Sequence, residues 1–507
     1  MSETSIPALL SHLGQRTKFH TVIEPGSGKP AFELPQLSAN EVFDAVDKAR
    51  AAQPTWQALP VEARAEILLK LHDLIIEKRE QLVDLLQFET GKARVHGFEE
   101  VAGAMNSARH FGKLAPRALH RKRVRSGAPL VVKNYITYVP VGVVGVITPW
   151  NYPLALTALD VLPALVGGNT VIHKIDNQTA LTALYLRSLA IQAGLPEEGW
   201  TIVVGDGAEV GNAITDSVDY VAFTGSTNTG RFVAERASKR LIGYSLELGG
   251  KNPLIVLPGA NLEKAADLAI GASIGNAGQL CVSIERIYVP NSVKQEFLDE
   301  LAAQVNSLRI GKSNQSDKDL GSLTSAAQIS RVRSMIEDAV REGAKLVTGG
   351  QPREDVGPYA ISPAVLTDIP PSAKLDRNEV FGPIMQVYGY DTVEHAIEMA
   401  NDSDYGLNAS VVGPTKDAYA VAEQLHAGSV NVNEGYRASF ASMDSPMGGF
   451  KTSGVGSRNG DYGLKRFMQP RSIGVATGLL KLPTRATEYK LVETLLFTLS
   501  KVLRRLP

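Results

Sequence analysis

Tyr138-Val-Pro-Val-Gly-Val-Val-Gly-Val-Ile147 is a β-rich run, and the turn Thr148-Pro-Trp-Asn-Tyr-Pro153 follows it directly. Helical and β-rich segments then alternate as far as residue 240, with helices expected at 154–165 and 181–193 and strands at 170–174, 201–204 and 220–223. This alternation predicts a parallel, doubly wound sheet. Because such sheets bind ligands at the carboxyl ends of their strands, the turn at 148–153 is a candidate site.

The second half of the chain alternates in the same way. It opens with Asn252-Pro-Leu-Ile-Val-Leu257 and continues as helix 262–274, strand 286–289, helix 293–307, helix 325–342 and strand 345–348. Ahead of the first unit, Ser38-Ala-Asn-Glu41 is a capping-box pattern that predicts the start of a helix. The sequence therefore predicts an α/β protein with two doubly wound, Rossmann-like units.

The composition excludes several functional classes. The 507 residues are 44% hydrophobic and 21% charged, and 52 basic against 53 acidic residues leave a net charge of −1. Nucleic-acid binding would need a clustered basic excess, so we expect no nucleic-acid partner. Residues 1–19 contain no apolar segment typical of a secretory signal, and no stretch is long and apolar enough to cross a bilayer. We therefore predict a cytoplasmic protein.

Cys281 is the only cysteine in the chain. A single thiol cannot form an intramolecular disulfide or a thiolate metal cage, and we predict no metal site. The thiol is either a small buried hydrophobe, the usual fate of a free cysteine, or a nucleophile. Gly275 and Gly278 permit a turn, and the polar Asn276 and Gln279 suit a bend that enters a site. These neighbours favour the nucleophile.

A nucleophilic thiol needs a base and a group that stabilises the anion it creates. Glu247 lies on the Gly-rich segment Glu247-Leu-Gly-Gly-Lys251 between the two units, where a carboxylate can act as a base in a cleft. Asn151 lies in the turn after the β-rich run, and its side-chain amide can donate to an oxyanion. Taken singly, Glu247 is more typical of a solvated loop charge and Asn151 of a turn residue.

Six motifs occur in one order along the chain. They are Thr148-Pro-Trp-Asn-Tyr-Pro153, Phe223-Thr-Gly-Ser-Thr227, Glu247-Leu-Gly-Gly-Lys251, Gly278-Gln-Leu-Cys281, Glu379-Val-Phe-Gly-Pro383 and Pro446-Met-Gly-Gly-Phe-Lys-Thr-Ser-Gly454. In these motifs and their spacing the sequence resembles the aldehyde dehydrogenase superfamily. The resemblance implies the fold of that superfamily: two Rossmann-like domains and a small β oligomerisation element.

The resemblance also implies a chemistry for the candidate residues. Cys281 would attack an aldehyde, and the Asn151 amide with the Cys281 backbone N–H would hold the oxyanion. Hydride transfer to a nicotinamide would leave a thioester, which Glu247 would hydrolyse by activating water. Relatives that transfer the acyl group to coenzyme A lack this glutamate, so its presence implies release of a carboxylic acid.

The same resemblance implies contacts to NAD or NADP. The matching positions are Thr148, Pro149, Trp150, Lys174, Asn177, Gly207, Gly225, Ser226 and Thr227, with Glu379 and Phe381 at the nicotinamide end. Relatives that prefer NAD commonly carry Glu where this chain has Asn177. A neutral Asn beside Lys174 would tolerate a 2′-phosphate, although Asp176 would repel it if it faced the same way. We predict NADP, with NAD as the alternative.

The resemblance further implies a division into domains. We expect a dinucleotide-binding domain at 1–127 and 144–247, a catalytic domain at 248–445, an oligomerisation hairpin and strand at 128–143 and 465–487, and an amphipathic helix at 488–507. Members of the superfamily assemble as dimers or tetramers through such a hairpin and a late strand, which here correspond to Leu130–Tyr138 and Arg471–Val475. We therefore expect a homodimer or homotetramer.

The last helix is expected over residues 488–506. Its apolar face carries Leu491, Leu495, Leu499, Val502 and Leu503, and Lys501, Arg504 and Arg505 lie near its end. A basic amphipathic helix can lie on a membrane surface. Such helices more often pack on their own protein or on a partner subunit, and we favour packing over membrane contact.

The substrate is the least determined part of the sequence. Residues 275–289, 240–244 and 431–436 resemble an actinobacterial branch assigned as NADP-dependent succinate-semialdehyde dehydrogenase, so we predict oxidation of succinate semialdehyde to succinate. Better-known succinate-semialdehyde enzymes bind the substrate carboxylate with two arginines, and these positions are Leu159 and Gly275 here. Arg437 could compensate. The expected pocket is largely apolar: Tyr152, Leu156, Leu159, Leu280, Val282, Tyr436 and Phe440.

Two alternatives stay open from the sequence. The apolar pocket is compatible with a broad aliphatic or aromatic aldehyde dehydrogenase. A non-catalytic dinucleotide-binding protein is the alternative from a different class, because fold alone never establishes activity. The presence of Cys281, Glu247 and Asn151 together argues against the non-catalytic alternative.

Overall fold

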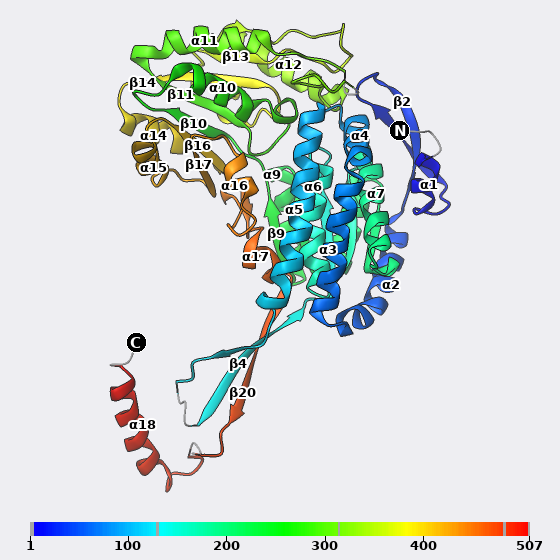
Figure 1. Cartoon of the computed structure of the whole chain (residues 1–507), viewed down its shortest axis with the longest axis vertical. Coiled ribbons are helices and arrows are strands. Elements are labelled where there is room, and N and C mark those ends of the chain that lie inside the picture. Colours follow the sequence, from blue (N-terminus) through cyan, green and yellow to red (C-terminus); the bar gives the residue numbers. More distant parts are fainter. Residues whose placement is uncertain (1–4, 128–130, 313–314, 480–482, 505–507) are drawn as a thin grey trace.

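The computed structural model describes residues 5–127, 131–312, 315–479 and 483–504. Two α/β units lie against each other, and a narrow arm of strands extends away from them (Figure 1). The predicted fold class, two doubly wound units with a small β element, is confirmed. The residue boundaries of the domains stay a prediction.

The first unit is built on a six-stranded sheet whose inner strands are parallel. Its order is β19 (Gly454–Val455), β9 (Gly243–Glu247), β8 (Tyr220–Thr224), β5 (Val143–Thr148), β6 (Thr170–Ile175) and β7 (Trp200–Val203). Only the short edge strand β19, which arrives from the far end of the chain, is antiparallel. The apolar runs of the sequence become these strands because helices bury both faces of a parallel sheet.

The run Tyr138–Ile147 is β-rich as predicted, and the structure divides it between two strands. Its first residues end the arm strand β4 (Val132–Pro140), and the sheet strand β5 begins at Val143. Gly142 lies at the break with φ +127°, and a Cβ there would lie 2.4 Å from Asp219 Oδ2. The close approach requires glycine, which lets the chain leave the arm and enter the sheet.

Helices cover the first sheet. They are α1 (Ser5–Ser11), α2 (Ala39–Ala58), α3 (Val61–Glu77), α4 (Arg79–Thr90), α5 (Arg94–Ala118), α6 (Pro153–Val166), α7 (Ala180–Gln192), α8 (Gly207–Ser217) and α9 (Thr227–Lys239). Every residue of α6 is buried, because this helix packs between the sheet and the outer helices α3 and α5. The Ser38–Glu41 capping box forms as predicted and starts α2. A hairpin of β1 (Lys18–Glu24) and β2 (Lys29–Gln36) flanks the unit.

The second unit is built on a seven-stranded sheet. Its order is β12 (Lys345–Thr348), β13 (Ala364–Thr367), β14 (Ile384–Tyr390), β11 (Ile284–Pro290), β10 (Asn252–Val256), β16 (Asn408–Val412) and β17 (Ser429–Val432). All neighbours are parallel except β12, which is an antiparallel edge. The principal helices are α10 (Leu262–Ser273), α11 (Lys294–Ser307), α12 (Ala326–Arg341), α14 (Val393–Asn401) and α15 (Thr415–Ala422).

Shorter elements complete the second half of the chain. They are α13 (Lys374–Arg377), α16 (Arg437–Ala441), α17 (Gly460–Lys465), β15 (Tyr405–Gly406), β18 (Phe450–Lys451) and the 3₁₀ turns η1 (Asn177–Thr179), η2 (Glu197–Gly199), η3 (Gly275–Gly278) and η4 (Asn291–Val293). Of these, η3 leads into Cys281, and α16 and the segment around α17 border the candidate site.

The strand order locates a crevice. In the first sheet the chain builds outward through β5, β6 and β7 and then returns to place β8 on the other side of β5. Such a switch point opens a crevice at the carboxyl ends of the two strands, where doubly wound proteins bind ligands. The strand β5 ends at Thr148 and β8 at Thr224, so the motifs 148–153 and 223–227 border this crevice.

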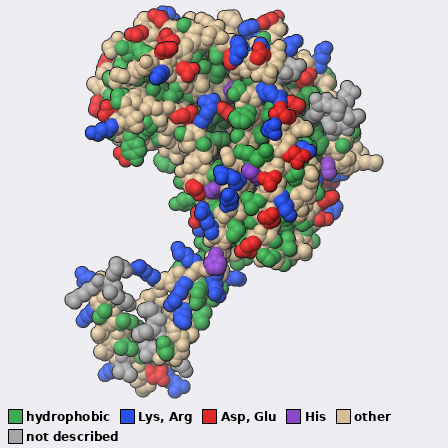
Figure 2. Space-filling model, viewed as in Figure 1, with side chains coloured by type: hydrophobic (Ala, Val, Ile, Leu, Met, Phe, Trp, Pro, Cys, Tyr) green, Lys and Arg blue, Asp and Glu red, His purple; other side chains and the backbone are tan. Residues whose placement is uncertain are grey.

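The arm consists of β3 (Lys122–Val124), β4 and β20 (Met468–Ala476), and the strand pairing includes the predicted partners 130–138 and 471–475 as far as they are described. Lys and Arg side chains lie along the arm (Figure 2). Beyond the arm lies α18 (Tyr489–Leu503), close to the predicted 488–506. On its apolar face Leu495 and Val502 are exposed and Leu499 is half-buried; Leu130, Arg505 and the side chains of Leu491 and Leu503 lie outside the described part. No described helix is long and apolar enough to cross a membrane.

Candidate active site

The candidate residues lie where the two sheets meet. Glu247 is the last residue of β9, and Asn151 follows the end of β5 by three residues. Cys281 comes just before β11, so it lies at the amino end of its own sheet and not at a carboxyl end. Asn252, the first residue of β10, donates from Nδ2 to the backbone oxygens of Cys281 and Ser283, both at 2.7 Å. This amide ties the cysteine loop to the segment that carries Glu247.

The bend predicted before Cys281 is present, but its centre is not a glycine. Asn276 and Ala277 have φ values of 51° and 54°, and Gly278 continues at 72°. A left-handed alanine costs about 1–2 kcal/mol, so the surroundings must hold the kink. Gln279 does so: its Nε2 donates to Asn276 O at 3.0 Å, and its Oε1 accepts from Thr324 N at 3.0 Å.

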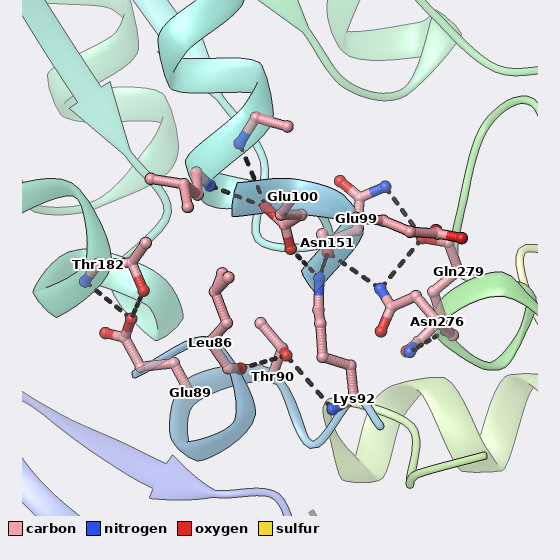
Figure 3. A network of polar contacts seen from close by, with 12 residues as sticks. Leu86, Glu89, Thr90, Lys92, Glu99, Glu100, Asn151, Thr182, Asn276 and Gln279 are labelled. Carbon is pink, nitrogen blue, oxygen red and sulfur yellow. Dashed lines mark hydrogen bonds and ion pairs between the residues drawn. The ribbon is translucent and has the colours of Figure 1, made fainter. Parts of the chain in front are cut away.

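Asn151 is held from several sides (Figure 3). Its Nδ2 donates to Gln279 O at 3.0 Å, and its backbone oxygen accepts from Asn276 Nδ2 at 2.9 Å and from Lys92 Nζ at 2.7 Å. An amide nitrogen carries two hydrogens, and the bond to Gln279 uses only one. The second hydrogen has no hydrogen-bond partner among the described residues.

Lys92 and Glu100 form a buried ion pair that the sequence analysis missed (Figure 3). Both side chains are fully buried, and burial lowers the pKa of Lys92 and raises the pKa of Glu100, so each ion depends on the other. Glu100 Oε2 also accepts from Leu154 N at 2.9 Å and Ala155 N at 3.3 Å, at the start of α6. The pair therefore fixes both ends of the Asn151 turn. The Lys92 ammonium also lies 4.2 Å from the centre of the Tyr152 ring.

The ionisable groups around the thiol change one another's pKa values. Burial raises the pKa of Cys281 to about 12, and the negative charges of Glu379 and Glu247 add to this, while Arg458 opposes it. Burial also raises the pKa of Glu247 to about 7, against the lowering effect of Arg458 and Arg466. The thiol is thus neutral in the resting structure, whereas Glu247 changes its charge near neutral pH. Glu247 Oε1 is buried and has no hydrogen-bond partner among the described residues.

Among the residues matched to dinucleotide contacts, Glu379 and Phe381 contact the segments that follow β9 and β5. Glu379 Oε1 accepts from Gly250 N at 3.0 Å, and a Cβ on Gly249 would lie 2.7 Å from Glu379 Oε2, so only glycine fits there. Burial raises the pKa of Glu379 to about 7. The rings of Trp150 and Phe381 pack edge to face with centroids 5.6 Å apart. The crevice is therefore built from backbone and rigid side chains.

Lys174 lies on β6 and is buried, and no ion pair found among the described residues includes it. Among these residues its Nζ donates to Ile175 O at 3.3 Å. Burial lowers its pKa, and the charges of Asp176 and Asp206 oppose this effect. Asn177 Oδ1 accepts from Gly205 N at 3.0 Å, and Asp176 accepts from Gln178 N at 3.0 Å. A buried ammonium without a carboxylate partner fits an anionic group of a dinucleotide. Gly207, Gly225, Ser226 and Thr227 lie at the starts of α8 and α9, where backbone N–H groups favour phosphate.

A cavity of about 190 Å³ beside the Cys281 loop is lined mainly by apolar side chains. Six of the seven predicted pocket residues line it: Tyr152, Leu159, Leu280, Val282, Tyr436 and Phe440. Leu156 packs in the same hydrophobic cluster but does not line the cavity, which corrects that prediction. The sequence analysis missed one wall, the face of α5 that carries Phe98, Glu99, Ala102, Gly103 and Asn106. Their helical spacing is visible in the sequence, but no motif marks them.

Arg437 lies at this cavity with its charge already paired. Its Nε donates to Glu99 Oε1 at 2.8 Å, and the Tyr436 hydroxyl donates to Glu99 Oε2 at 3.1 Å. Gly275 lies close by, and a Cβ there would lie 2.8 Å from the Tyr436 hydroxyl. Tyr436 therefore fills the space that a side chain at position 275 would need.

The fold and the site define an α/β protein of two doubly wound units with a cysteine, an amide and a carboxylate at their junction. The chain belongs to the aldehyde dehydrogenase family: the sequence model described as "Aldehyde dehydrogenase family" matches residues 13–473. The resemblance found in the six motifs is confirmed.

Relatives and solved structures agree with this assignment. The chain is 45% identical over 457 residues to "Putative succinate-semialdehyde dehydrogenase [NADP(+)] 2" of Mycobacterium tuberculosis, covering 90% of this chain and 88% of the relative. It is 43% identical to a similarly named protein of Mycolicibacterium smegmatis, covering 95% and 93%. Betaine aldehyde dehydrogenase from Staphylococcus aureus in complex with NAD+ superposes with a TM-score of 0.89 at 30% identity, covering 96% and 99%. An NADP-dependent enzyme of E. coli gives 0.87 at 32%, covering 90% and 95%.

Proposed function

We propose that the protein oxidises an aldehyde to a carboxylic acid with a nicotinamide dinucleotide, through a thiohemiacetal and a thioester on Cys281. The junction of Cys281, Asn151 and Glu247 carries the proposal. A thiol, an amide with one unused hydrogen and a carboxylate that titrates near neutral pH meet there, each fixed by a different element.

The first step is attack by the sulfur. The thiolate is the nucleophile, so the Cys281 proton must leave first. With the pKa of the thiol at about 12 and the pKa of Glu247 at about 7, Glu247 is the base suited to accept it, directly or through water. The sulfur then bonds to the aldehyde carbon, and the π electron pair of the C=O bond moves to the oxygen. Asn151 Nδ2 and the Cys281 backbone N–H are the donors for that oxyanion.

The second step regenerates the thiol. Bound NAD(P) would supply the hydride acceptor that converts the thiohemiacetal to a thioester. Once Glu247 has passed the Cys281 proton to solvent, it removes a proton from water, and the hydroxide oxygen bonds to the thioester carbon. The carbon–sulfur bond then breaks, so that the acid leaves and Cys281 becomes a thiolate again.

We propose NADP as the preferred cofactor. The buried Lys174 ammonium has no carboxylate partner, and Asn177 is neutral at the position where a glutamate would repel a 2′-phosphate. Asp176 accepts from Gln178 N, but its charge and the charge of Asp206 still act on Lys174, so NAD remains the alternative. The ratio of kcat/KM for NADP and NAD tests this. A ratio that strongly favours NAD and does not change in Asn177→Glu would contradict it.

The cavity best supports an aldehyde with an uncharged, apolar chain. Its lining is mainly apolar, and Glu99 adds a negative charge beside the positive charge of Arg437. An anionic substrate at Arg437 would have to approach two carboxylates, Glu99 on Nε and Glu434 at 3.8 Å from Nη1. Displacing a buried or half-buried partner costs the bonds that it made, so this geometry favours neutral aliphatic or aromatic aldehydes.

Succinate semialdehyde is the second candidate, favoured by the names of the mycobacterial relatives. Arg437 is the cation at the cavity that could bind its carboxylate. A steady-state panel of succinate semialdehyde, hexanal and benzaldehyde, each with NADP and NAD, separates the two candidates. If succinate semialdehyde gave the highest kcat/KM, the apolar assignment would fall; if it came last, the second candidate would fall.

The variant Glu99→Gln helps to separate charged from neutral substrates in this panel. It removes the charge that pairs Arg437 but keeps a side chain of the same shape. A carboxylate-bearing substrate would then approach Arg437 with one carboxylate fewer beside it, since Glu434 remains, and its kcat/KM would rise by about tenfold. The kcat/KM for hexanal would stay unchanged. Cys281→Ser tests the catalytic proposal itself, because full activity in that variant would contradict the assignment of Cys281 as the nucleophile.

The assembly is a separate proposal, supported by the family of the chain. We propose a homodimer or homotetramer built through the arm of β3, β4 and β20, whose strands extend beyond both units (Figure 1). Sedimentation of the full chain tests the assembly. Residence in the cytoplasm stays a prediction from the sequence.

A further inference from the structure

A second buried group of charges lies beside Glu247, and the catalytic steps above do not use it. Arg458 donates from Nε to Asp160 Oδ1 at 2.8 Å and from Nη2 to Asp160 Oδ2 at 2.5 Å. Arg466 also donates to Asp160 Oδ1. Asp160 is 0% and Arg458 1% exposed, so these charges are withdrawn from water. Residues separated by almost 300 positions, on α6 and after β19, thus form one buried cluster.

The cluster faces the strand that carries Glu247. Ser245 and Glu247 lie two residues apart on β9, so their side chains point to the same face of the sheet. Ser245 Oγ accepts from Arg466 Nη1 at 3.1 Å. Thr224, the register partner of Glu247 on β8, accepts from Arg458 Nη2 through its hydroxyl. Both guanidinium groups are therefore anchored to the part of the sheet where the Glu247 carboxylate lies.

The charges in this region do not cancel without Glu247. Two guanidinium groups face one aspartate, which leaves one positive charge in a buried environment. An uncompensated buried charge is costly, and an ionised Glu247 would balance it. Among the described residues, the charges of Glu247 and Glu379 also act on the Cys281 thiol. During hydrolysis of the thioester the sulfur is acylated and carries no charge, so the cluster dominates the field at Glu247.

We propose that Arg458, held in place by Asp160, is a positioning residue for hydrolysis: its charge keeps Glu247 ionised and so sets the pH above which the acyl-enzyme is cleared. This inference rests on the proposed role of Glu247 as the base that activates water. The balance of effects on Glu247 agrees with it, since burial raises the pKa of the carboxyl and Arg458 is the largest opposing influence. Asp160 acts in the opposite direction, as a second negative charge.

The test isolates hydrolysis from hydride transfer. p-Nitrophenyl acetate acylates a reactive thiol directly: the sulfur bonds to the acetyl carbon, p-nitrophenolate leaves, and no cofactor is needed. The decay of the acetyl-enzyme is then followed by intact-protein mass spectrometry from pH 5 to pH 9 in the wild type, R458M, R458K and D160N. Arg231, an exposed residue on α9, supplies the control variant R231M.

We expect the two charge changes to move the pH midpoint of decay in opposite directions. R458M raises the midpoint by about one pH unit and D160N lowers it, while R458K and R231M keep it near the wild-type value. A merely structural role would slow decay without such opposite shifts. A midpoint that is unchanged in D160N, or in a folded R458M, overturns the proposal. If R458M does not fold, D160N decides alone, because it keeps both guanidinium groups.

E247Q separates this inference from the function on which it rests. If E247Q clears its acetyl group as fast as the wild type, the role of Glu247 as base is wrong and the proposed mechanism fails with it. If E247Q is slow but D160N and R458M leave the midpoint unchanged, the mechanism stands and only the role of Arg458 fails.

Discussion

Two buried charge clusters flank Cys281, and they are built differently. Lys92 and Glu100 form a one-to-one pair, and each also bonds to the backbone of the Asn151 turn. The cluster of Asp160, Arg458 and Arg466 has two positive charges for one negative charge. Its neighbour Glu247 keeps one carboxylate oxygen without a partner among the described residues.

The difference separates two tasks that buried charges can perform. A balanced pair with backbone partners has no net charge with which to attract a ligand. Its contacts instead hold Asn151 at one position. An unbalanced cluster leaves a field, and a field can act on a group that gains and loses a proton during the reaction. We therefore expect damage to the first cluster to appear in stability and oxyanion binding, and damage to the second in pH dependence.

The largest effect is expected from Lys92→Met. The substitution leaves Glu100 charged without its partner and removes the Nζ bond to Asn151 O, so the free energy of unfolding should fall by about 3–5 kcal/mol. Chemical denaturation measures the loss. Lys113→Met, at an exposed position on the neighbouring α5, is the control and should change stability by less than about 0.5 kcal/mol.

A double variant tests whether Lys92 and Glu100 act as a pair. The double variant Lys92→Met/Glu100→Gln removes both charges, so it should be more stable than Lys92→Met alone. If the two single losses simply added in the double variant, the two side chains would not act as a balanced pair and the contrast between the clusters would disappear.

Asn151→Ala should give the next largest effect. It removes the proposed oxyanion donor, which typically costs a factor of about 10²–10³ in rate. Rapid-mixing measurement of reduced-cofactor formation in the first turnover reports this step directly. The decay of a preformed acetyl-enzyme should keep its pH midpoint, because the second cluster is intact. A shifted midpoint would show that the two regions are not separate in function.

The rate of hydrolysis at low pH tests the role of the second cluster. The pKa of Glu247 is raised by burial to about 7, and the base works only when ionised, so hydrolysis should weaken as pH falls through 7. Below the midpoint the rate of acetyl-enzyme decay should fall about tenfold per pH unit. Glu379 has a pKa near 7 as well, so Glu379→Gln is the control and should keep the profile. If Glu379→Gln lost the pH dependence, the dependence would belong to Glu379 and not to Glu247.

The two clusters also show what a sequence can predict. The alternation of strands and helices gives the two sheets, because the apolar periodicity of a segment is a local property. Cys281, Asn151 and Glu247 could be named because each lies in a short motif and only the motifs together are specific. The same reasoning placed six pocket residues at the cavity and erred at Leu156, where a helix turns one apolar side chain into the core instead of the cavity.

The buried charges could not be predicted in this way. Lys92 follows a helix end and Glu100 lies within a helix, where both look like ordinary solvated charges. Asp160 and Arg458 are 298 positions apart, and no local pattern joins them. The left-handed Asn276 and Ala277 are likewise invisible, since side-chain contacts of Asn276 with Asn151 O and of Gln279 with Asn276 O hold that kink. Features that depend on packing between distant segments need the structure.

The smallest effect is expected from Ser245→Ala. It removes the hydroxyl that accepts from Arg466 Nη1 at 3.1 Å but leaves every charge of the second cluster in place. The free energy of unfolding should fall by about 0.5–1.5 kcal/mol, the usual contribution of one hydrogen bond. If the net charge of the cluster, and not its bonding geometry, controls the ionisation of Glu247, the pH midpoint of acetyl-enzyme decay should stay at its wild-type value. A midpoint that moved as far as in R458M would mean that the position of Arg466 matters as much as its charge, and the second cluster would then resemble the first.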